Sequence, residues 1–322
     1  MRPKISVIGA GNVGATVAQF LSIQDLGDIY LFDVVDGKPE GEALDMMEGT
    51  PHWGVDNNIK GFTTTNPENY SHMKGSDVIV ITAGLARKPG MSRDDLLVKN
   101  IGIIKDVAEN VKKYSPESLI VMVSNPADTM AYAFQKVSGI DPKRIIGLGG
   151  SLDSSRFRTF IAMELGVSIK DVNAFVVGGH GDDMVPFIRY SSVAGMPIST
   201  LLSREKIDEI VKRTRFGGGE IVDLLKTGSA YYAPGISITA MVESIIKDKK
   251  RVIPCAAYMD AENAKHYSAQ GLFIGVPIKI GKDGVEHIYR IDFNEEEKVL
   301  WNKTVESVKK NGEKVDAVLS QH

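Results

Sequence analysis

One histidine, one aspartate and one arginine have the types and settings for proton transfer on an anionic substrate. His180 ends an apolar run, "AFVVGG", and begins the glycine-flanked turn "GGHGDD", so its ring would emerge from a strand end. Asp153 and Arg156 are three apart in "GSLDSSRFRTF" and would share a helix face. An imidazole can exchange a proton with an alcohol or a carbonyl, a carboxylate fixes its tautomer, and an arginine grips a substrate carboxylate.

Two further arginines lie in "RKPGMSR", where Arg87 and Arg93 are six positions apart around Pro89 and Gly90. A solvated surface turn is one interpretation of these seven residues. The other is a lid that carries two fixed positive charges to a substrate and swings on the Pro-Gly pair. These residues alone do not separate the two.

Metal binding is the competing use of His180. The other five histidines lie in polar surroundings or at the chain end, and the only cysteine is Cys255. No second histidine or thiolate stands at ligand spacing from His180, so we expect no metal site.

The stretch "GAGNVG", residues 9–14, follows an apolar run and opens a helical segment. Gly9, Gly11 and Gly14 would let the backbone approach a pyrophosphate at a helix N-terminus. Asp33 ends the next strand and would accept hydrogen bonds from ribose hydroxyls, while its charge opposes a 2′-phosphate. The pattern therefore predicts NAD rather than NADP. The alternative is a glycine turn that only helps the helix pack on the sheet.

These side chains need elements to position them, and the first 150 residues alternate between short apolar runs and helical segments. The predicted strands are "KISVIG", "DIYLFD", "NIKGFTTT", "SDVIVITAG", "SLIVMVSN" and "RIIGLGG". Near-continuous Val and Ile are typical of parallel strands covered on both faces. The clearest helix is predicted for residues 94–113, with Ser92 as its N-cap. We predict an α/β fold with a doubly wound parallel sheet.

Beyond residue 150 the rhythm is mixed, which predicts a second, α+β domain. Helices are expected in "SSRFRTFIAMELG", around 204–226 and 236–248, and in the charged C-terminal segment. Strand-like pieces are "VNAFVVGG" and "MVPFIRYSSVAG", and "GLFIGVPIKIGKDGVEHIYRI" reads as two strands joined by a Lys-Asp-Gly turn. The predicted domains are residues 1–148 and 149–322.

Composition excludes several classes of protein. The chain has 322 residues, is 43% hydrophobic and 25% charged, and carries a net charge of -3. This balance gives no reason to expect nucleic acid or an anionic membrane as a partner. Asn12 and the glycines interrupt the first apolar run, so we expect neither a secretory signal nor a membrane span. A single cysteine fits a reducing cytoplasm.

Seven segments together resemble one family. In chain order they are "GAGNVG", "DVVDG", "TAGLARKPGMSRDDL", "VSNPADTM", "GLGGSLDSSRFRTF", "VVGGHGDDMVP" and "GSAYYAPG". With these segments in register, essentially the whole chain resembles the lactate/malate dehydrogenase family, in its lactate-dehydrogenase-like branch. The resemblance implies an NAD-binding Rossmann domain, a catalytic domain and hydride transfer to or from a 2-hydroxy acid.

The resemblance also implies roles for individual residues. His180 matches the family's acid/base histidine, and Asp153 matches the aspartate that partners it. Arg156 matches the arginine that clamps the carboxylate beside the reacting carbon. Arg93 matches the arginine that polarises the C2 oxygen. Asn125 matches the residue that touches nicotinamide and substrate. The cofactor contacts implied are Gly9, Gly11, Asn12, Val13, Gly14, Asp33, Asn100, Val123 and Asn125.

Arg87 matches the position that discriminates between substrates. A cation there favours a second substrate carboxylate, because a buried carboxylate is costly unless it is paired. We therefore expect reversible oxidation of (S)-malate to oxaloacetate, a reaction of the tricarboxylic acid cycle. The rivals are a lactate or broad 2-hydroxy-acid dehydrogenase and a non-catalytic dinucleotide sensor. The family resemblance implies a homo-oligomer, a tetramer before a dimer.

Overall fold

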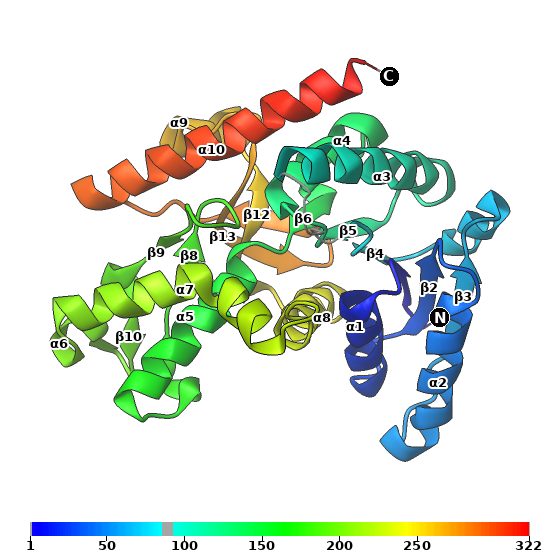
Figure 1. Ribbon diagram of the computed structural model, residues 1–322, viewed down its shortest axis with the longest axis horizontal. Coiled ribbons are helices and arrows are strands. Elements are labelled where there is room, and N and C mark those ends of the chain that lie inside the picture. Colours follow the sequence, from blue (N-terminus) through cyan, green and yellow to red (C-terminus); the bar gives the residue numbers. More distant parts are fainter. Residues whose placement is uncertain (1, 86–92, 322) are drawn as a thin grey trace.

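The structure is a computed structural model that describes residues 2–85 and 93–321 (Figure 1). Its centre is a nine-stranded sheet in the order β14-β13-β12-β6-β5-β4-β1-β2-β3. Helices cover the sheet, as Figure 1 shows. The α/β fold with an N-terminal Rossmann sheet and a C-terminal α/β region is confirmed.

The first six strands are parallel, and each coincides with one of the six predicted apolar runs. They are β1 (Lys4–Ile8), β2 (Asp28–Asp33), β3 (Ile59–Thr63), β4 (Val78–Ile81), β5 (Leu119–Met122) and β6 (Ile145–Gly147). Between them lie α1 (Asn12–Ile23), α2 (Lys38–Trp53), the 3₁₀ turn η1 (Pro67–Met73), α3 (Arg93–Tyr114), α4 (Ala127–Ser138) and η2 (Pro142–Arg144). Since these strands are parallel, their carboxyl ends meet at one edge of the sheet.

Strand β4 shows why these strands are apolar throughout. Val78 and Val80 belong to the core formed with α1 and with α8 (Tyr232–Ile246), whereas Ile79 and Ile81 belong to the core formed with α3 and α4. Successive side chains point to opposite faces of a strand, and both faces here are covered. The strand therefore has no solvent-facing position that would favour a polar residue.

The C-terminal half is built from strands of very unequal length, two to nine residues, and from helices. Its elements are α5 (Gly150–Leu165), η3 (Ile169–Asp171), β7 (Val172–Asn173), β8 (Val176–Val177), β9 (Val185–Pro186), η4 (Ile188–Tyr190), β10 (Ser192–Val193), β11 (Met196–Pro197), α6 (Ile198–Leu201), α7 (Arg204–Leu225), α8 (Tyr232–Ile246), β12 (Arg251–Tyr258), α9 (Ala261–Tyr267), β13 (Phe273–Gly281), β14 (Gly284–Ile288) and α10 (Glu295–Leu319). The expected helices and the hairpin of β13 and β14 are present. The piece at 184–195 is instead two short strands around a 3₁₀ turn. Of the helices in residues 2–85 and 93–321, none has the length and apolar character to span a bilayer.

Strand β12 escaped the sequence patterns, because Pro254 lies within it and proline lacks the N–H that a ladder needs. In the fold Pro254 stands opposite Pro277 of β13, so both missing donors share one rung. On its other side β12 pairs with β6 through Ala256 and Gly147. The C-terminal strands thereby extend the parallel sheet.

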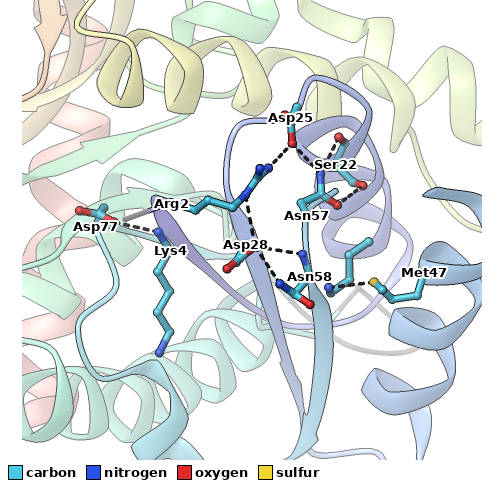
Figure 2. A network of polar contacts seen from close by, with 10 residues as sticks. Arg2, Lys4, Ser22, Asp25, Asp28, Met47, Asn57, Asn58 and Asp77 are labelled. Atoms are coloured by element: carbon cyan, nitrogen blue, oxygen red, sulfur yellow. Dashed lines mark hydrogen bonds and ion pairs between the residues drawn. The ribbon is translucent and has the colours of Figure 1, made fainter. Parts of the chain in front are cut away.

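A polar network ties the amino edge of the parallel strands together (Figure 2). Asn57 Nδ2 donates to the Ser22 carbonyl at 2.8 Å, and Ser22 Oγ donates to Asn57 Oδ1 at 2.9 Å. Asp28 accepts from the Asn58 N–H, and Arg2 pairs with Asp25. These contacts join α1, β2 and the start of β3 at the edge opposite the predicted site.

Candidate active site

The glycine loop connects β1 to α1 and is packed tightly on its inner side. Gly9 has φ +105°, and a Cβ there would lie 2.6 Å from Thr82 Oγ1. A Cβ on Gly14 would lie 1.8 Å from the Gly9 carbonyl oxygen. By contrast, the Cβ position of Gly11 has nothing within 4 Å, and this N-cap of α1 makes no side-chain cap. Gly11 thus leaves room at a helix N-terminus, where a phosphate group is favoured.

Asp33 stands beside this loop because β2 pairs with β1. Its Oδ2 accepts from the Ala10 N–H at 2.7 Å, and its Oδ1 accepts from the Val35 N–H at 2.9 Å. A carboxylate has about four lone-pair sites, so two such bonds leave capacity for ribose hydroxyls. The structure therefore brings together the acid and the glycines of the predicted dinucleotide site.

The other predicted cofactor residues lie at neighbouring ends of elements. Asn12 is exposed at the start of α1, Val13 behind it is half-buried, and Val123 is buried just after β5. Asn125 is exposed two residues later.

Asn100 of α3 has a different setting, because its amide group bridges two backbone segments. Its Oδ1 accepts from the Leu85 N–H at 2.8 Å, and its Nδ2 donates to the Asn125 carbonyl at 3.1 Å. Asn100 therefore holds the chain just before residue 86 against the Asn125 turn.

Two predicted arginines can be placed only in part. Arg87, with Pro89, Gly90 and Ser92, lies outside the described residues, so the lid interpretation and the N-cap stay predictions. Arg93 opens α3, and only its backbone is described.

The turn before His180 is held by three successive backbone N–H groups. The Gly178 N–H donates to the Gly275 carbonyl of β13, and the Gly179 N–H donates to Thr304 Oγ1 of α10, both at 2.8 Å. The His180 N–H donates to Asp128 Oδ2 of α4, also at 2.8 Å. Elements from three distant parts of the chain thus fix the backbone that carries the imidazole.

The structure brings His180, Asp153 and Arg156 together. His180 Nδ1 lies 2.8 Å from Asp153 Oδ2, and Arg156 Nη1 donates to Asp153 Oδ1 at 3.3 Å. The Asp153 side chain is 1% exposed, and those of His180 and Arg156 are 14% and 15% exposed. One buried carboxylate therefore orients both an imidazole and a guanidinium that reach toward the surface.

This carboxylate favours the imidazolium form. Burial by itself disfavours a charged ring, but the charge of Asp153, its hydrogen bond and the charge of Asp128 together outweigh burial, so the pKa of His180 is raised above its usual value. Because Nδ1 is engaged by Asp153, Nε2 is the nitrogen left to exchange a proton with a bound molecule.

A second buried carboxylate was not found by the sequence patterns. Asp128 is 3% exposed, and its Oδ1 has no hydrogen-bond partner among the described residues. Burial raises the pKa of its carboxyl to about 6, although the bond from the His180 N–H opposes the shift. Its signal in the sequence is weak: it is the one charge in "NPADTMAYAFQ", where an acid in a first helical turn is ordinary.

A cavity of about 460 Å³ opens beside this cluster. Asn125, Asp128 and His180 contribute to its wall, together with Thr304 and Asn311 of α10. A cavity of this size can hold a small organic ligand.

Family models match both halves of the chain. The model described as lactate/malate dehydrogenase, NAD binding domain, matches residues 3–147. The model described as lactate/malate dehydrogenase, alpha/beta C-terminal domain, matches residues 150–319.

Individual relatives agree with these models. The malate dehydrogenase of Thermoplasma volcanium is 71% identical over 321 residues, which are 100% of this chain and 99% of that protein. The apo structure of malate dehydrogenase from Picrophilus torridus matches with TM-score 0.98 and 71% identity, over 100% of this chain and 99% of that one. Lactate dehydrogenase from Cryptosporidium parvum, solved with lactic acid and β-nicotinamide adenine dinucleotide, matches with TM-score 0.92 and 41% identity, over 98% of each chain.

Proposed function

Because this chain belongs to the lactate/malate dehydrogenase family, we propose that it catalyses reversible hydride transfer between (S)-malate and NAD⁺, giving oxaloacetate and NADH. The observation that carries the proposal is the 2.8 Å contact of His180 Nδ1 with Asp153, whose other oxygen accepts from Arg156. Imidazole, carboxylate and guanidinium are the groups that oxidation of a hydroxy acid needs. The 71% identical relatives named malate dehydrogenase support the choice of substrate.

The residues of the N-terminal half fit a dinucleotide. Gly11 has an open Cβ position at the start of α1, and Asp33 keeps acceptor capacity beside it. The loop and α1 would hold the pyrophosphate, Asp33 the adenosine ribose, and Val123 and Asn125 the nicotinamide end. When bound, NAD supplies the ring carbon that takes or returns hydride. The charge of Asp33 supports NAD over NADP, since a 2′-phosphate beside it would be repelled.

His180 would handle the proton. In malate oxidation the O–H proton passes to Nε2 while the C2–H bond breaks, its electron pair leaves with the hydrogen as hydride, and a C=O bond forms. In the reverse direction protonated Nε2 gives its proton to the carbonyl oxygen. Asp153 stabilises the imidazolium in both directions, consistent with the raised pKa of His180.

The arginines would bind the anionic parts of the substrate. Arg156 would grip the carboxylate beside the reacting carbon, with its position set by Asp153. Arg93 would polarise the C2 oxygen, and Arg87 would pair with the second carboxylate. Closing the segment that carries these two arginines would exclude water and strengthen the charge interactions.

One steady-state experiment tests the proposal by crossing oxaloacetate and pyruvate with NADH and NADPH. We expect kcat/KM to be highest for oxaloacetate with NADH. NADH binding without turnover of either acid would instead favour the dinucleotide sensor.

A lactate or broad 2-hydroxy-acid dehydrogenase is the second candidate, because the lactate dehydrogenase of Cryptosporidium parvum has the same fold at 41% identity. Arg87 argues against it, since a buried arginine facing the methyl group of pyruvate would be unpaired. We expect Arg87→Gln to shift the ratio of kcat/KM values toward pyruvate. An unchanged ratio would remove Arg87 from the specificity role.

We also propose a homo-oligomer, a tetramer before a dimer, working in the cytoplasm. Large apolar side chains are exposed on α2, α7 and α8, among them Leu44, Leu224 and Tyr232. Side chains of this kind would mark a subunit interface where they gather into one patch. Light scattering on the purified protein would distinguish four, two and one chain masses.

A further inference from the structure

Helix α7 has three consecutive glycines in its interior, Gly217, Gly218 and Gly219, within "TRFGGGEIV". Glycine lowers helix stability because its backbone loses the most freedom on folding. A run of three in the middle of a 22-residue helix therefore needs a reason in the packing.

Two of the three glycines lie against the side chain of Arg156. A Cβ on Gly217 would lie 3.3 Å from Arg156 Cδ, and a Cβ on Gly218 would lie 3.5 Å from Arg156 Nη2. The Cβ position of Gly219 has nothing within 4 Å. Helices α5 and α7 lie side by side (Figure 1), so this contact belongs to the interface between them.

The contact covers the part of Arg156 that Asp153 does not hold. Asp153 Oδ1 accepts from Nη1 at 3.3 Å, a distance at the long end for a charged hydrogen bond. The bare surface of α7 meets the aliphatic stem at Cδ and the other terminal nitrogen, Nη2. The guanidinium is thus bounded by a carboxylate at one nitrogen and by helix backbone at the other.

An ion pair spans the glycine run and would keep it helical. Arg213 donates to Glu220 through Nε at 2.9 Å and through Nη2 at 2.7 Å. The Arg213 guanidinium also lies 4.3 Å from the ring centroid of Phe160, and Phe160 Cε2 is 3.6 Å from the Cβ position of Gly217. Because both side chains are partly exposed, this two-point ion pair adds only a small stabilisation across the weak segment.

We propose that Gly217 and Gly218 are positioning residues that seat Arg156, so that its guanidinium meets the substrate carboxylate beside the reacting carbon. The inference rests on the proposed role of Arg156. A methyl group on Gly217 displaces the arginine by a few tenths of an ångström and misaligns its two-point grip. That carboxylate is common to oxaloacetate and pyruvate, so substitutions of Gly217 and Gly218 should affect both acids equally. A substitution of Arg87 should instead affect oxaloacetate more than pyruvate.

The test compares Gly217→Ala and Gly218→Ala with Gly219→Ala, which makes the same change one position further along in open space. We expect Gly217→Ala to raise KM for oxaloacetate and for pyruvate about tenfold, with kcat and KM for NADH little changed. Gly218→Ala gives a smaller rise, and Gly219→Ala leaves every constant near the wild-type value. Equal rises of KM in all three variants would mean that the glycines act through helix flexibility. An unchanged KM in Gly217→Ala would overturn the inference that Gly217 positions Arg156.

Arg156→Ala separates this inference from the proposed function. If Arg156→Ala leaves KM for oxaloacetate unchanged, the proposed role of Arg156 is wrong, and the inference about the two glycines is wrong with it. If Arg156→Ala raises KM but Gly217→Ala does not, the role of Arg156 stands and only the positioning role of Gly217 is contradicted. In the Arg156→Ala background Gly217→Ala should add nothing to KM, because the group that it displaces is gone. A further rise of KM in that double variant would also overturn the inference that Gly217 positions Arg156.

Thermal melting and NADH fluorescence identify any variant that misfolds. If Gly217→Ala misfolds, Gly218→Ala is the milder substitution that still tests the contact with Arg156.

Discussion

At the amino edge of the parallel strands polar side chains bond to one another, whereas at the carboxyl edge they surround His180 and the glycine loop. Around Asn57 and Ser22, both buried, donors and acceptors are paired within the network (Figure 2). Around His180, Asp128 keeps an oxygen with no partner among the described residues. Such a group lowers stability, because burial disfavours an unpaired charge.

We infer from this difference that the amino edge serves stability and the carboxyl edge serves the proposed function. Parallel strands place every loop that follows a strand at the carboxyl edge, where Gly9, Asp33 and Asn125 stand. The amino edge receives only the returning chain from the helices, so its polar groups can pair fully. Substitutions at the two edges should therefore have different signatures.

The largest effect is expected from His180→Asn at the carboxyl edge. Loss of the proton-exchanging group should reduce kcat about 10⁴-fold, while NADH affinity stays near wild type. Stopped-flow turnover and fluorescence titration measure the two quantities. Near-wild-type turnover would show that His180 does not exchange the proton.

Asp153→Asn should have the next largest effect, about 10²-fold on kcat/KM for oxaloacetate at neutral pH. Reduction needs protonated His180, so wild-type kcat/KM is constant at low pH and falls as pH rises through the raised pKa of His180. Without the charge of Asp153 this fall should move to lower pH. A profile that keeps its position would mean that Asp153 does not control the imidazole.

The same pair links stability to pH. Because the folded-state pKa of His180 is raised, its contribution to the unfolding free energy is complete below the unfolded pKa of about 6.5 and is lost as pH rises through the folded value. Asp153→Asn should therefore lower the unfolding free energy, relative to the wild type, more at pH 6 than at pH 9. Urea unfolding at the two pH values measures the difference, and equal losses would contradict the link.

Asp128→Asn sharpens the contrast between the edges, because the buried carboxylate costs stability when charged. The pKa of Asp128 is raised to about 6, so between about 4 and 6 the folded chain binds more protons than the unfolded chain. Wild-type unfolding free energy then falls as pH rises through this window. The unfolding free energy of Asp128→Asn, relative to that of the wild type, should therefore rise by about 2 kcal/mol from pH 4 to pH 7. A difference that does not change with pH would place the pKa of Asp128 near that of an ordinary aspartate.

Asn57→Ala at the amino edge should have the smallest effect on activity and a loss of stability at every pH. It leaves the buried Ser22 hydroxyl and carbonyl without Asn57, which costs about 2 kcal/mol. The midpoint of urea unfolding should fall, while kcat per folded molecule is unchanged. A change in kcat would mean that the amino edge is coupled to the site.

The sequence predicted the elements better than it predicted their contacts. The six parallel strands follow from continuous Val and Ile, and Asp153 with Arg156 follows from a spacing of three on a helix. The strand β12 did not follow, since Pro254 argues against a strand unless Pro277 stands opposite it. That rung forms only when two segments 23 positions apart meet.

By itself, therefore, the sequence determined the local patterns: apolar period, glycine loop, the acid that ends β2, and a histidine on a turn. The tertiary structure alone decided that Gly275, Thr304 and Asp128 would hold the backbone of that turn, and that α7 would lie against Arg156. The physical reason is that periodicity and turn chemistry act between near neighbours in the chain. Burial and long-range hydrogen bonds depend on which distant segments pack together, and that is settled only when the whole core forms.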